Sequence, residues 1–223
     1  MLSNMVAAGE WRPRLNIIFI FFGAEEQGSI GSHRYVHNCR AEADSTPRLR
    51  RHRQDCGLPE AFRFHAGSSS GALIIDQVGY VEPSREVGLP IVLEADGRTP
   101  GSATLLRKLV RAGRRYTPVS TITYSLRADR SDHLSFSMEH SAAALSRESY
   151  LNPCYHSTCD TVDRLSTPML AAVTKMNLAT AMELSGADPV SHAMSMSSAA
   201  ALARSYIVLY LPFFCLAPFN LRD

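Results

Sequence analysis

The sequence lacks an uninterrupted hydrophobic run that could cross a membrane. Its apolar C-terminal stretch, residues 199–219, is interrupted by Arg204, Pro212 and Pro218, whereas a spanning helix needs ~20 predominantly apolar residues. The first residues, MLSNMVAAGEWRPR, also lack a basic leader ahead of a long apolar core, so they do not form a signal peptide. We therefore expect no membrane partner, and the compartment stays open.

A large excess of charge of one sign is also missing. The formal net charge is +2, and the one dense basic run, residues 48–53, has no aromatic residues interleaved with it. A nucleic-acid surface needs clustered cations, and one for single strands also needs aromatic stacking platforms. We therefore interpret the run as a solvated loop and expect no nucleic-acid partner. Nothing in the sequence indicates an oligomeric state.

Cysteine is scarce, and its odd count excludes a fully paired framework within one chain. The five cysteines include Cys154 and Cys159, which are close enough in sequence to form a disulfide. Such a bond would suit a secreted protein. Two free thiols are equally compatible with the sequence.

The composition that is present is typical of a globular α/β protein. Hydrophobic residues make up 45% of the chain and charged residues 20%, which excludes a disordered chain. Strands are predicted at residues 16–22, at 72–75, from 91 and at 119–126, and helices from Ser32, at 102–113 and at 167–186. Because strands alternate with helices, an α/β domain is expected.

The chain divides into one domain and a tail. Residues 1–188 form the predicted domain, with an irregular insertion at about residues 40–71. Residues 189–223 comprise a Ser/Ala-rich linker and the apolar C-terminal tail.

Carboxylates follow two of the predicted buried strands. Glu25 and Glu26 come directly after residues 16–22, and Asp76 comes directly after residues 72–75. Sites in open α/β sheets gather at the carboxyl ends of strands. Two adjacent carboxylates repel each other unless a cation or a proton compensates, so one can bind a metal while the other accepts a proton. Solvated glutamates and a turn-capping aspartate are the alternative interpretation.

A histidine in a rigid polar loop provides a further candidate ligand. His156 stands in NPCYHSTCDT, where Pro153 restricts the backbone and Asp160 is close enough in sequence to orient the imidazole. Two other patterns are weak. Ser131, Asp132 and His133 are adjacent and cannot form a catalytic relay, and residues 67–71 match G-x-S-x-G but precede a strand instead of following one.

Four segments between residues 15 and 170 resemble, in order, the motifs of the co-catalytic zinc aminopeptidases of metallopeptidase clan MH, the family of the bacterial leucyl aminopeptidases. FIFFGAEEQGSIGS resembles the strand and Glu-Glu loop, and IIDQVGY resembles the Asp-x-x-Gly strand. RSDHLSF and YHSTCDTVDRLS resemble the two later motifs. The resemblance implies a mixed, mostly parallel β-sheet sandwiched between helices, the Zn-dependent exopeptidase or phosphorylase/hydrolase-like fold.

The resemblance also implies an activity and site roles. Family members are metalloexopeptidases that remove N-terminal residues from peptide substrates with two zinc ions. Glu25 matches the general base that activates the attacking water. Glu26 and His156 match ligands of one zinc, and Asp76 matches a ligand of the second. Tyr155 stands where some members stabilise the tetrahedral intermediate. The residues that bind the substrate side chain are not indicated.

The resemblance is incomplete upstream of the Glu-Glu loop. The family places a His ligand and a metal-bridging Asp there, whereas residues 1–24 contain neither residue type. We therefore expect the chain to begin inside the domain, with the sheet incomplete at its N-terminus. We also expect these 223 residues alone not to form a competent two-zinc peptidase. Complete relatives are often secreted.

Two alternatives stay open at this stage. A glutaminyl cyclase-type acyltransferase of the same clan typically uses one zinc and has Trp before the late His, so Tyr155 favours the peptidase. A truncated pseudo-enzyme with a binding role is the non-catalytic alternative, and metal content would separate it from the peptidase.

Overall fold

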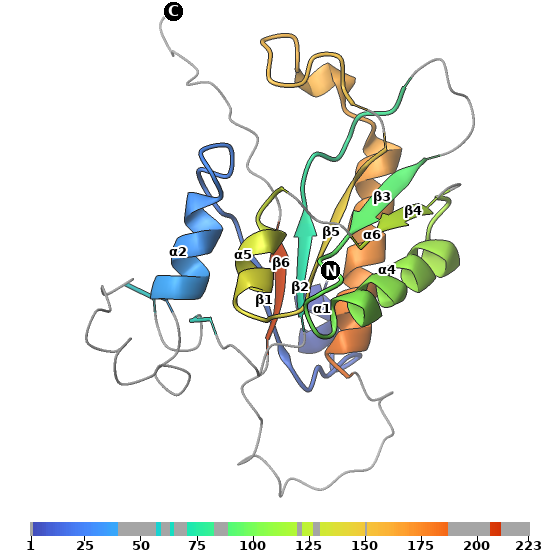
Figure 1. Cartoon of the computed structure of the whole chain (residues 1–223). Coiled ribbons are helices and arrows are strands. Elements are labelled where there is room, and N and C mark those ends of the chain that lie inside the picture. The colour runs from blue at the N-terminus through green and yellow to red at the C-terminus, as the bar shows by residue number, and fades with distance from the viewer. Residues whose placement is uncertain are drawn as a thin grey trace, which may run out of the picture.

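The described residues form a mixed six-stranded sheet in the order β1-β6-β2-β5-β3-β4 (Figure 1). The computed structural model describes residues 2–39, 57–58, 63–64, 71–82, 89–119, 122–126, 130–149, 151–186 and 206–210. The strands are β1 (Asn16–Ile20), β2 (Gly71–Ile75), β3 (Ile91–Glu94), β4 (Ile122–Ser125), β5 (Ala143–Glu148) and β6 (Tyr206–Tyr210). The helices are α1 (Leu2–Ala7), α2 (Ile30–Asn38), α4 (Ser102–Tyr116), α5 (His133–Met138) and α6 (Thr167–Leu184).

The sheet is mostly parallel. β1, β6, β2 and β5 run in one direction, β3 pairs antiparallel to β5, and β4 runs parallel to β3. The carboxyl ends of β1, β2 and β5 therefore meet at the same edge of the sheet. The predicted mixed, mostly parallel α/β fold is confirmed.

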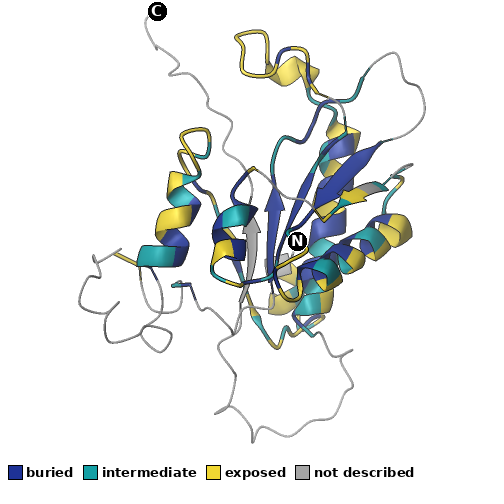
Figure 2. Ribbon diagram, in the orientation of Figure 1, coloured by how far each residue is buried: buried dark blue, intermediate teal, exposed yellow. Residues whose placement is uncertain are grey.

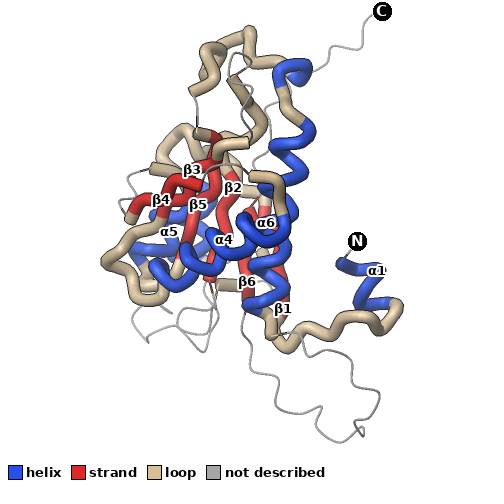
Figure 3. The backbone as a smooth tube through the Cα atoms, turned by 90° about the vertical axis from the view of Figure 1, so that its right-hand side faces the viewer, coloured by secondary structure: helices blue, strands red, loops and turns tan. Residues whose placement is uncertain are grey.

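Helices cover both faces of the sheet. α4 and α6 lie in front of the strands in Figure 3, and α2 and α5 pack on the opposite face. The strand β2 shows how the sequence produces two cores, because its side chains alternate between the faces. Leu73 and Ile75 pack with α4 and α6, while Ala72 and Ile74 pack with the aromatic residues of α2 and α5. Figure 2 shows β2, β3 and β5 buried.

Most predicted elements are present, with shifted boundaries. α6 begins as predicted, because the Ser166 side chain accepts a hydrogen bond from the Met169 N–H and Pro168 occupies the first turn. α2 begins at Ile30, two residues before the predicted Ser32. Gly113 was predicted to end α4 but lies inside the helix. A Cβ at Gly113 would approach Ile122 to 2.8 Å and Met176 to 3.0 Å, so packing explains this glycine.

The sequence pattern predicted β1 and β2 among the four parallel strands but not β5 and β6. β6 lies within the stretch interpreted as a linker and tail, and it pairs with both β1 and β2. The division at residue 188 stays a prediction. The predicted insertion at residues 40–71 falls mostly outside the described residues.

Within the part of the chain that the structure describes, no helix combines the length and the apolar character needed to cross a membrane. The interrupted stretch at residues 199–219 is described only over β6.

Candidate functional site

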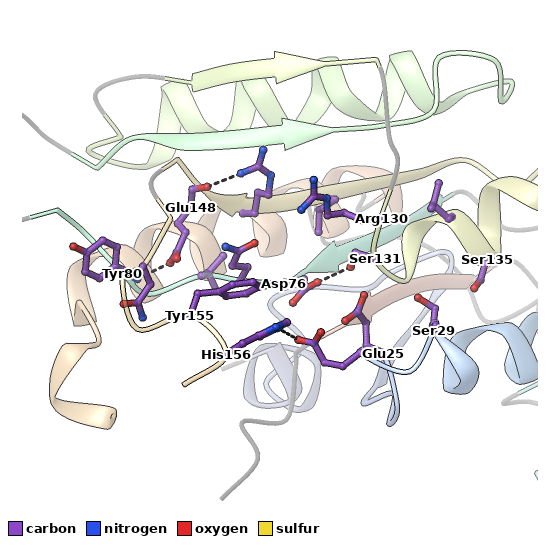
Figure 4. A pocket seen from close by; sticks show the side chains of 18 of the residues that line it. Glu25, Ser29, Asp76, Tyr80, Arg130, Ser131, Ser135, Glu148, Tyr155 and His156 are labelled. Atoms are coloured by element: carbon purple, nitrogen blue, oxygen red, sulfur yellow. Dashed lines mark hydrogen bonds and ion pairs between the residues drawn. The ribbon is translucent and has the colours of Figure 1, made fainter. Parts of the chain in front are cut away.

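A cavity of about 660 Å³ opens at the carboxyl ends of β1, β2 and β5. Its lining includes every candidate site residue of the sequence analysis: Glu25, Glu26, Asp76, Tyr155 and His156. Figure 4 shows Glu25, Asp76 and His156 pointing into this common space from three different segments. The convergence expected from the motifs is therefore present, although the roles of the individual residues remain predictions.

Glu25 and Glu26 sit in a tight turn between β1 and α2. The Glu25 carbonyl accepts hydrogen bonds from the N–H groups of Gly28 at 2.9 Å and of Ser29 at 2.7 Å. Ala24 and Ser29 adopt left-handed backbone conformations, with φ of 59° and 55°. This turn brings the two carboxylates to the mouth of the cavity.

Asp76 is held by a residue from the segment before α5. It directly follows β2, whose five residues are all buried, and the Ser131 hydroxyl donates a 2.6 Å hydrogen bond to its Oδ2 atom. Gly79, three residues on, has φ of 127°, and a Cβ there would approach a Leu165 methyl carbon to 2.7 Å. The Asp-x-x-Gly spacing thus reflects a close approach between this segment and the chain leading into α6.

His156 reaches across the cavity to Glu26. Its Nε2 atom lies 2.7 Å from the Glu26 Oε1 atom, 130 residues away in sequence. The ring of Tyr155 stacks on the His156 ring with centroids 3.8 Å apart. Both residues lie in a loop closed by a disulfide between Cys154 and Cys159, so of the two alternatives left open by the sequence, the structure contains the bonded pair.

The predicted partner of the imidazole is different in the structure. Asp160 was expected to orient His156, but it accepts a 2.7 Å hydrogen bond from the Asn152 side chain. The carboxylate that faces His156 is that of Glu26. The Asn152 side chain binds Asp160, and the turn between β1 and α2 brings Glu26 to the imidazole instead.

The cavity concentrates negative charge. Burial and, after it, the neighbouring carboxylates of Asp76, Glu26 and Asp132 together raise the pKa of Glu25 to about 7, although His156 opposes the shift. Burial also raises the pKa of Asp76, although the hydrogen bond from Ser131 opposes this change. A carboxylate with a pKa near neutrality is suited to accept and return a proton.

Tyr155 remains a hydrogen-bond donor at neutral pH. Burial, followed by the charges of Glu26, Asp76 and Glu25, raises the pKa of its phenol above the ordinary value. The hydroxyl therefore stays protonated and can donate to a negatively charged oxygen in the cavity.

The imidazole and carboxylate groups of the cavity are of the types that bind zinc. Zinc binds imidazole nitrogen and carboxylate oxygen, and His156 and Glu26 already place one of each within 2.7 Å. The repulsion between the carboxylates, which contributes to the raised pKa of Glu25, would be relieved by a cation. Among the described residues, however, no group of three His, Cys, Asp or Glu side chains is gathered closely enough to hold a metal ion. The residues thus fit a zinc ion with two adjacent donors and a further carboxylate, Asp76, in the same cavity.

Three other potential ligands among the described residues, His33, His37 and Asp132, do not complete this set. Asp132 accepts a 2.5 Å hydrogen bond from Ser32, and His37 lies 2.9 Å from the Glu139 carboxylate. His33 lines the cavity, and its ring is tilted against that of His37 with the ring centroids 4.0 Å apart.

Four cavity residues were missed as site residues by the sequence analysis. Arg130 and Ser131 belong to the RSDHLSF motif, which was recognised without a role for them. Glu148 is buried and accepts a 2.6 Å hydrogen bond from the Tyr80 N–H, and Asn152 lies beside the disulfide loop. Asn152 has no sequence signature, and Glu148 was not recognised as a strand-end carboxylate because β5 was not among the predicted strands. The rejected Ser131–Asp132–His133 triad has no relay geometry, since Ser131 and Asp132 bond to different partners.

Three of the solved structures that match the chain come from bacteria. LapA of Legionella pneumophila matches with a TM-score of 0.51 and 23% identity over 74% of this chain and 39% of that chain. An aminopeptidase from Aneurinibacillus sp. strain AM-1 matches with a TM-score of 0.44 and 22% identity, over 83% of this chain and 35% of that chain. BSAP, a zinc aminopeptidase from Bacillus subtilis, matches with a TM-score of 0.48 and 20% identity, over 76% of this chain and 36% of that chain. This chain thus spans well under half the length of these structures. The similarity to LapA agrees with the α/β fold.

No curated protein sequence matches the chain. The model of one protein family, described as peptidase family M28, matches residues 1–181. That range contains every candidate site residue and all described elements except β6 and the end of α6. The chain belongs to peptidase family M28.

Proposed function

We propose that this protein acts as a zinc-dependent aminopeptidase that hydrolyses the N-terminal residue from peptide substrates. The observation that carries the proposal is the meeting of Glu25, Glu26, Asp76 and His156 in one cavity, with His156 and Glu26 2.7 Å apart. Membership of a peptidase family supports the reaction class. The aminopeptidase names of the matched proteins agree with it.

Each site residue has a role that follows from the chemistry of its side chain. Glu26 and His156 would hold one zinc ion, and Asp76 would hold a second. When bound, zinc supplies Lewis-acid polarisation of the scissile carbonyl and acidifies water. Glu25 accepts the proton of the attacking water and delivers it to the leaving amine, for which a pKa of about 7 is suited. The Tyr155 hydroxyl donates a hydrogen bond to the oxygen that becomes negatively charged.

Tyr155 supports the peptidase over the glutaminyl cyclase, because the cyclase typically carries Trp at the position before the late His.

The disulfide between Cys154 and Cys159 supports folding in an oxidising compartment. We therefore propose that the protein works outside the cytosol on extracellular or periplasmic peptides.

The test combines metal binding and turnover in the purified chain. Because these 223 residues alone are expected not to form a competent two-zinc site, we expect weak zinc binding and slow cleavage of aminoacyl chromogenic amides, still in preference to cyclisation of N-terminal Gln. Glu25→Gln should keep the bound zinc and the melting temperature but lower turnover by about 10²–10⁴-fold, because the amide cannot accept a proton. His156→Ala should lose zinc.

Glu10→Gln, which changes an exposed glutamate, is the matched control and should leave both properties unchanged. Full turnover in Glu25→Gln would show that Glu25 is not the base. Zinc binding without any turnover would favour the binding-protein alternative, and absence of zinc binding would contradict the proposal.

A further inference from the structure

The loop that carries His156 is held closed by one disulfide and by the hydrogen bonds of one side chain. The disulfide joins Cys154 to Cys159, with Cα atoms 5.2 Å apart, and encloses Tyr155 and His156. A second, non-covalent link comes from Asn152, which precedes the disulfide ring and lines the cavity.

Asn152 uses both halves of its amide. Its Oδ1 atom accepts a 2.9 Å hydrogen bond from the Cys154 N–H, and its Nδ2 group donates a 2.7 Å hydrogen bond to the Asp160 Oδ1 atom. Its main-chain carbonyl accepts from the Tyr155 N–H at 2.9 Å. An acceptor for Cys154 and a donor for Asp160 are both required, so neither Asp nor a hydrophobic residue can make the same pair of bonds. The side chain thus connects both ends of the loop, just outside the disulfide.

His156 needs such support from its backbone. Its side chain is 53% exposed, and the Tyr155 ring that stacks on it belongs to the same loop, so the position of the imidazole depends on the conformation of that loop. Its φ of 55° lies in the left-handed region, which a non-glycine residue occupies only when the surrounding structure determines it. The ring nevertheless points at Glu26, which belongs to a different segment.

We propose that Asn152 is a positioning residue for His156. By joining Cys154 to Asp160, it fixes the internal conformation of the loop, and with it the left-handed backbone at His156 from which the imidazole points toward Glu26. The disulfide closes the loop covalently, and the hydrogen bonds of Asn152 hold the residues on either side of the disulfide to each other. The consequence for metal affinity rests on the proposed function, whereas the consequence for the orientation of His156 does not.

A charge-swap series in the full chain tests the proposal near pH 8. Asn152→Asp keeps the acceptor for Cys154 but sets two carboxylates face to face, which repel each other. The double variant N152D/D160N restores a donor and an acceptor in reversed order. We expect the single variant to weaken zinc binding by about 10–100-fold, the usual effect of losing support behind a ligand, and the double variant to recover it.

A metal-free readout separates this proposal from the proposed function. In the unaltered chain, the ring ¹⁵N resonances of His156 should be those of a ring held in one orientation. In Asn152→Asp they should be averaged over several orientations, and in N152D/D160N they should again be those of a single orientation. Asp163→Ala, which removes an exposed carboxylate from the same region, should change neither readout. If the unaltered chain binds no zinc, the proposed function fails, and the resonances still decide the role of Asn152.

Two results would overturn the proposal. One is an unchanged His156 ring and zinc affinity in Asn152→Asp, and the other is a double variant as impaired as the single one. If Asn152→Asp does not fold, Asp160→Ala removes the same hydrogen bond from an exposed position. It should then show the same averaging of His156, and a fixed ring in Asp160→Ala would contradict the proposal.

Discussion

The two sides of the sheet that meet at the cavity are built differently. β2, β3 and almost all of β5 are buried, with helices on both faces. In β1 only Ile18 is buried, and Phe19 and the following Phe21 are each 52% exposed. Asp76 and His156 follow strands of the packed side, whereas Glu25 and Glu26 follow β1.

The two sides are held in place by different interactions: hydrophobic packing on one side and hydrogen bonds on the other. On the packed side, apolar side chains from both faces fix the strands. Among the described residues, β1 pairs only with β6, and the turn with Glu25 and Glu26 is fastened through α2. There the buried Ser32 hydroxyl donates to Asp132 and lies 2.8 Å from the Ser135 hydroxyl of α5. The position of Glu25, the proposed general base, would thus depend on a few hydrogen bonds. The position of Asp76 depends on the hydrophobic packing of β2.

The largest effect is expected from a cavity in the packed side. Leu73 in β2 has no exposed surface and packs with α4 and α6. Leu73→Ala should lower the free energy of unfolding by about 2–5 kcal/mol, because the transfer free energy is lost and a void remains. Urea denaturation measures this value.

Phe19→Ala in β1 is the matched test on the other side. Its ring is half exposed, so the change should be within about 0.5 kcal/mol. A loss in Phe19→Ala as large as that in Leu73→Ala would show that the two sides are equally packed.

A smaller effect is expected from the polar attachment of β1. Asp132 has no exposed surface and accepts from Ser32. Asp132→Ala should cost about 1–3 kcal/mol, because buried polar groups lose a partner. Hydrogen exchange should show faster opening of α2 than of α6. Equal protection of the two helices would refute the idea that this network fastens α2.

The smallest effect expected from a buried side chain is a pH dependence on the packed side. Burial raises the pKa of Glu148 from 4.5 to about 7, although the Tyr80 N–H bond opposes the shift. The folded state therefore binds this proton more tightly than the unfolded state does. The resulting stability is full below about pH 4.5 and is lost as the pH rises through about 7.

Glu148→Gln keeps an acceptor for Tyr80 but does not titrate. The unaltered chain should lose about 1–2 kcal/mol more stability than this variant between pH 5 and pH 8. Thermal unfolding of the metal-free proteins at both pH values measures the difference. Parallel pH profiles would mean that Glu148 has an ordinary pKa in the folded chain.

The sequence by itself determined the strands, helices and motifs that depend on local chemistry. The apolar runs of β1 and β2, the Ser166 cap of α6 and the carboxylates after two strands could be recognised because strand pattern, capping and strand-end position are properties of neighbouring residues. The resemblance of four ordered motifs then indicated which of these side chains meet.

Only the tertiary structure decided the contacts between distant segments. β6 could not be predicted as an inner strand, because pairing with β1 and β2 depends on residues more than a hundred positions away. The 2.7 Å contact of His156 with Glu26, the bond of Ser131 to Asp76 and the link from Asn152 to Asp160 arise from the directions in which folded loops point. Sequence spacing fixes which residues are available for a site, but the packing of the sheet and the closure of its loops fix which side chains face one another.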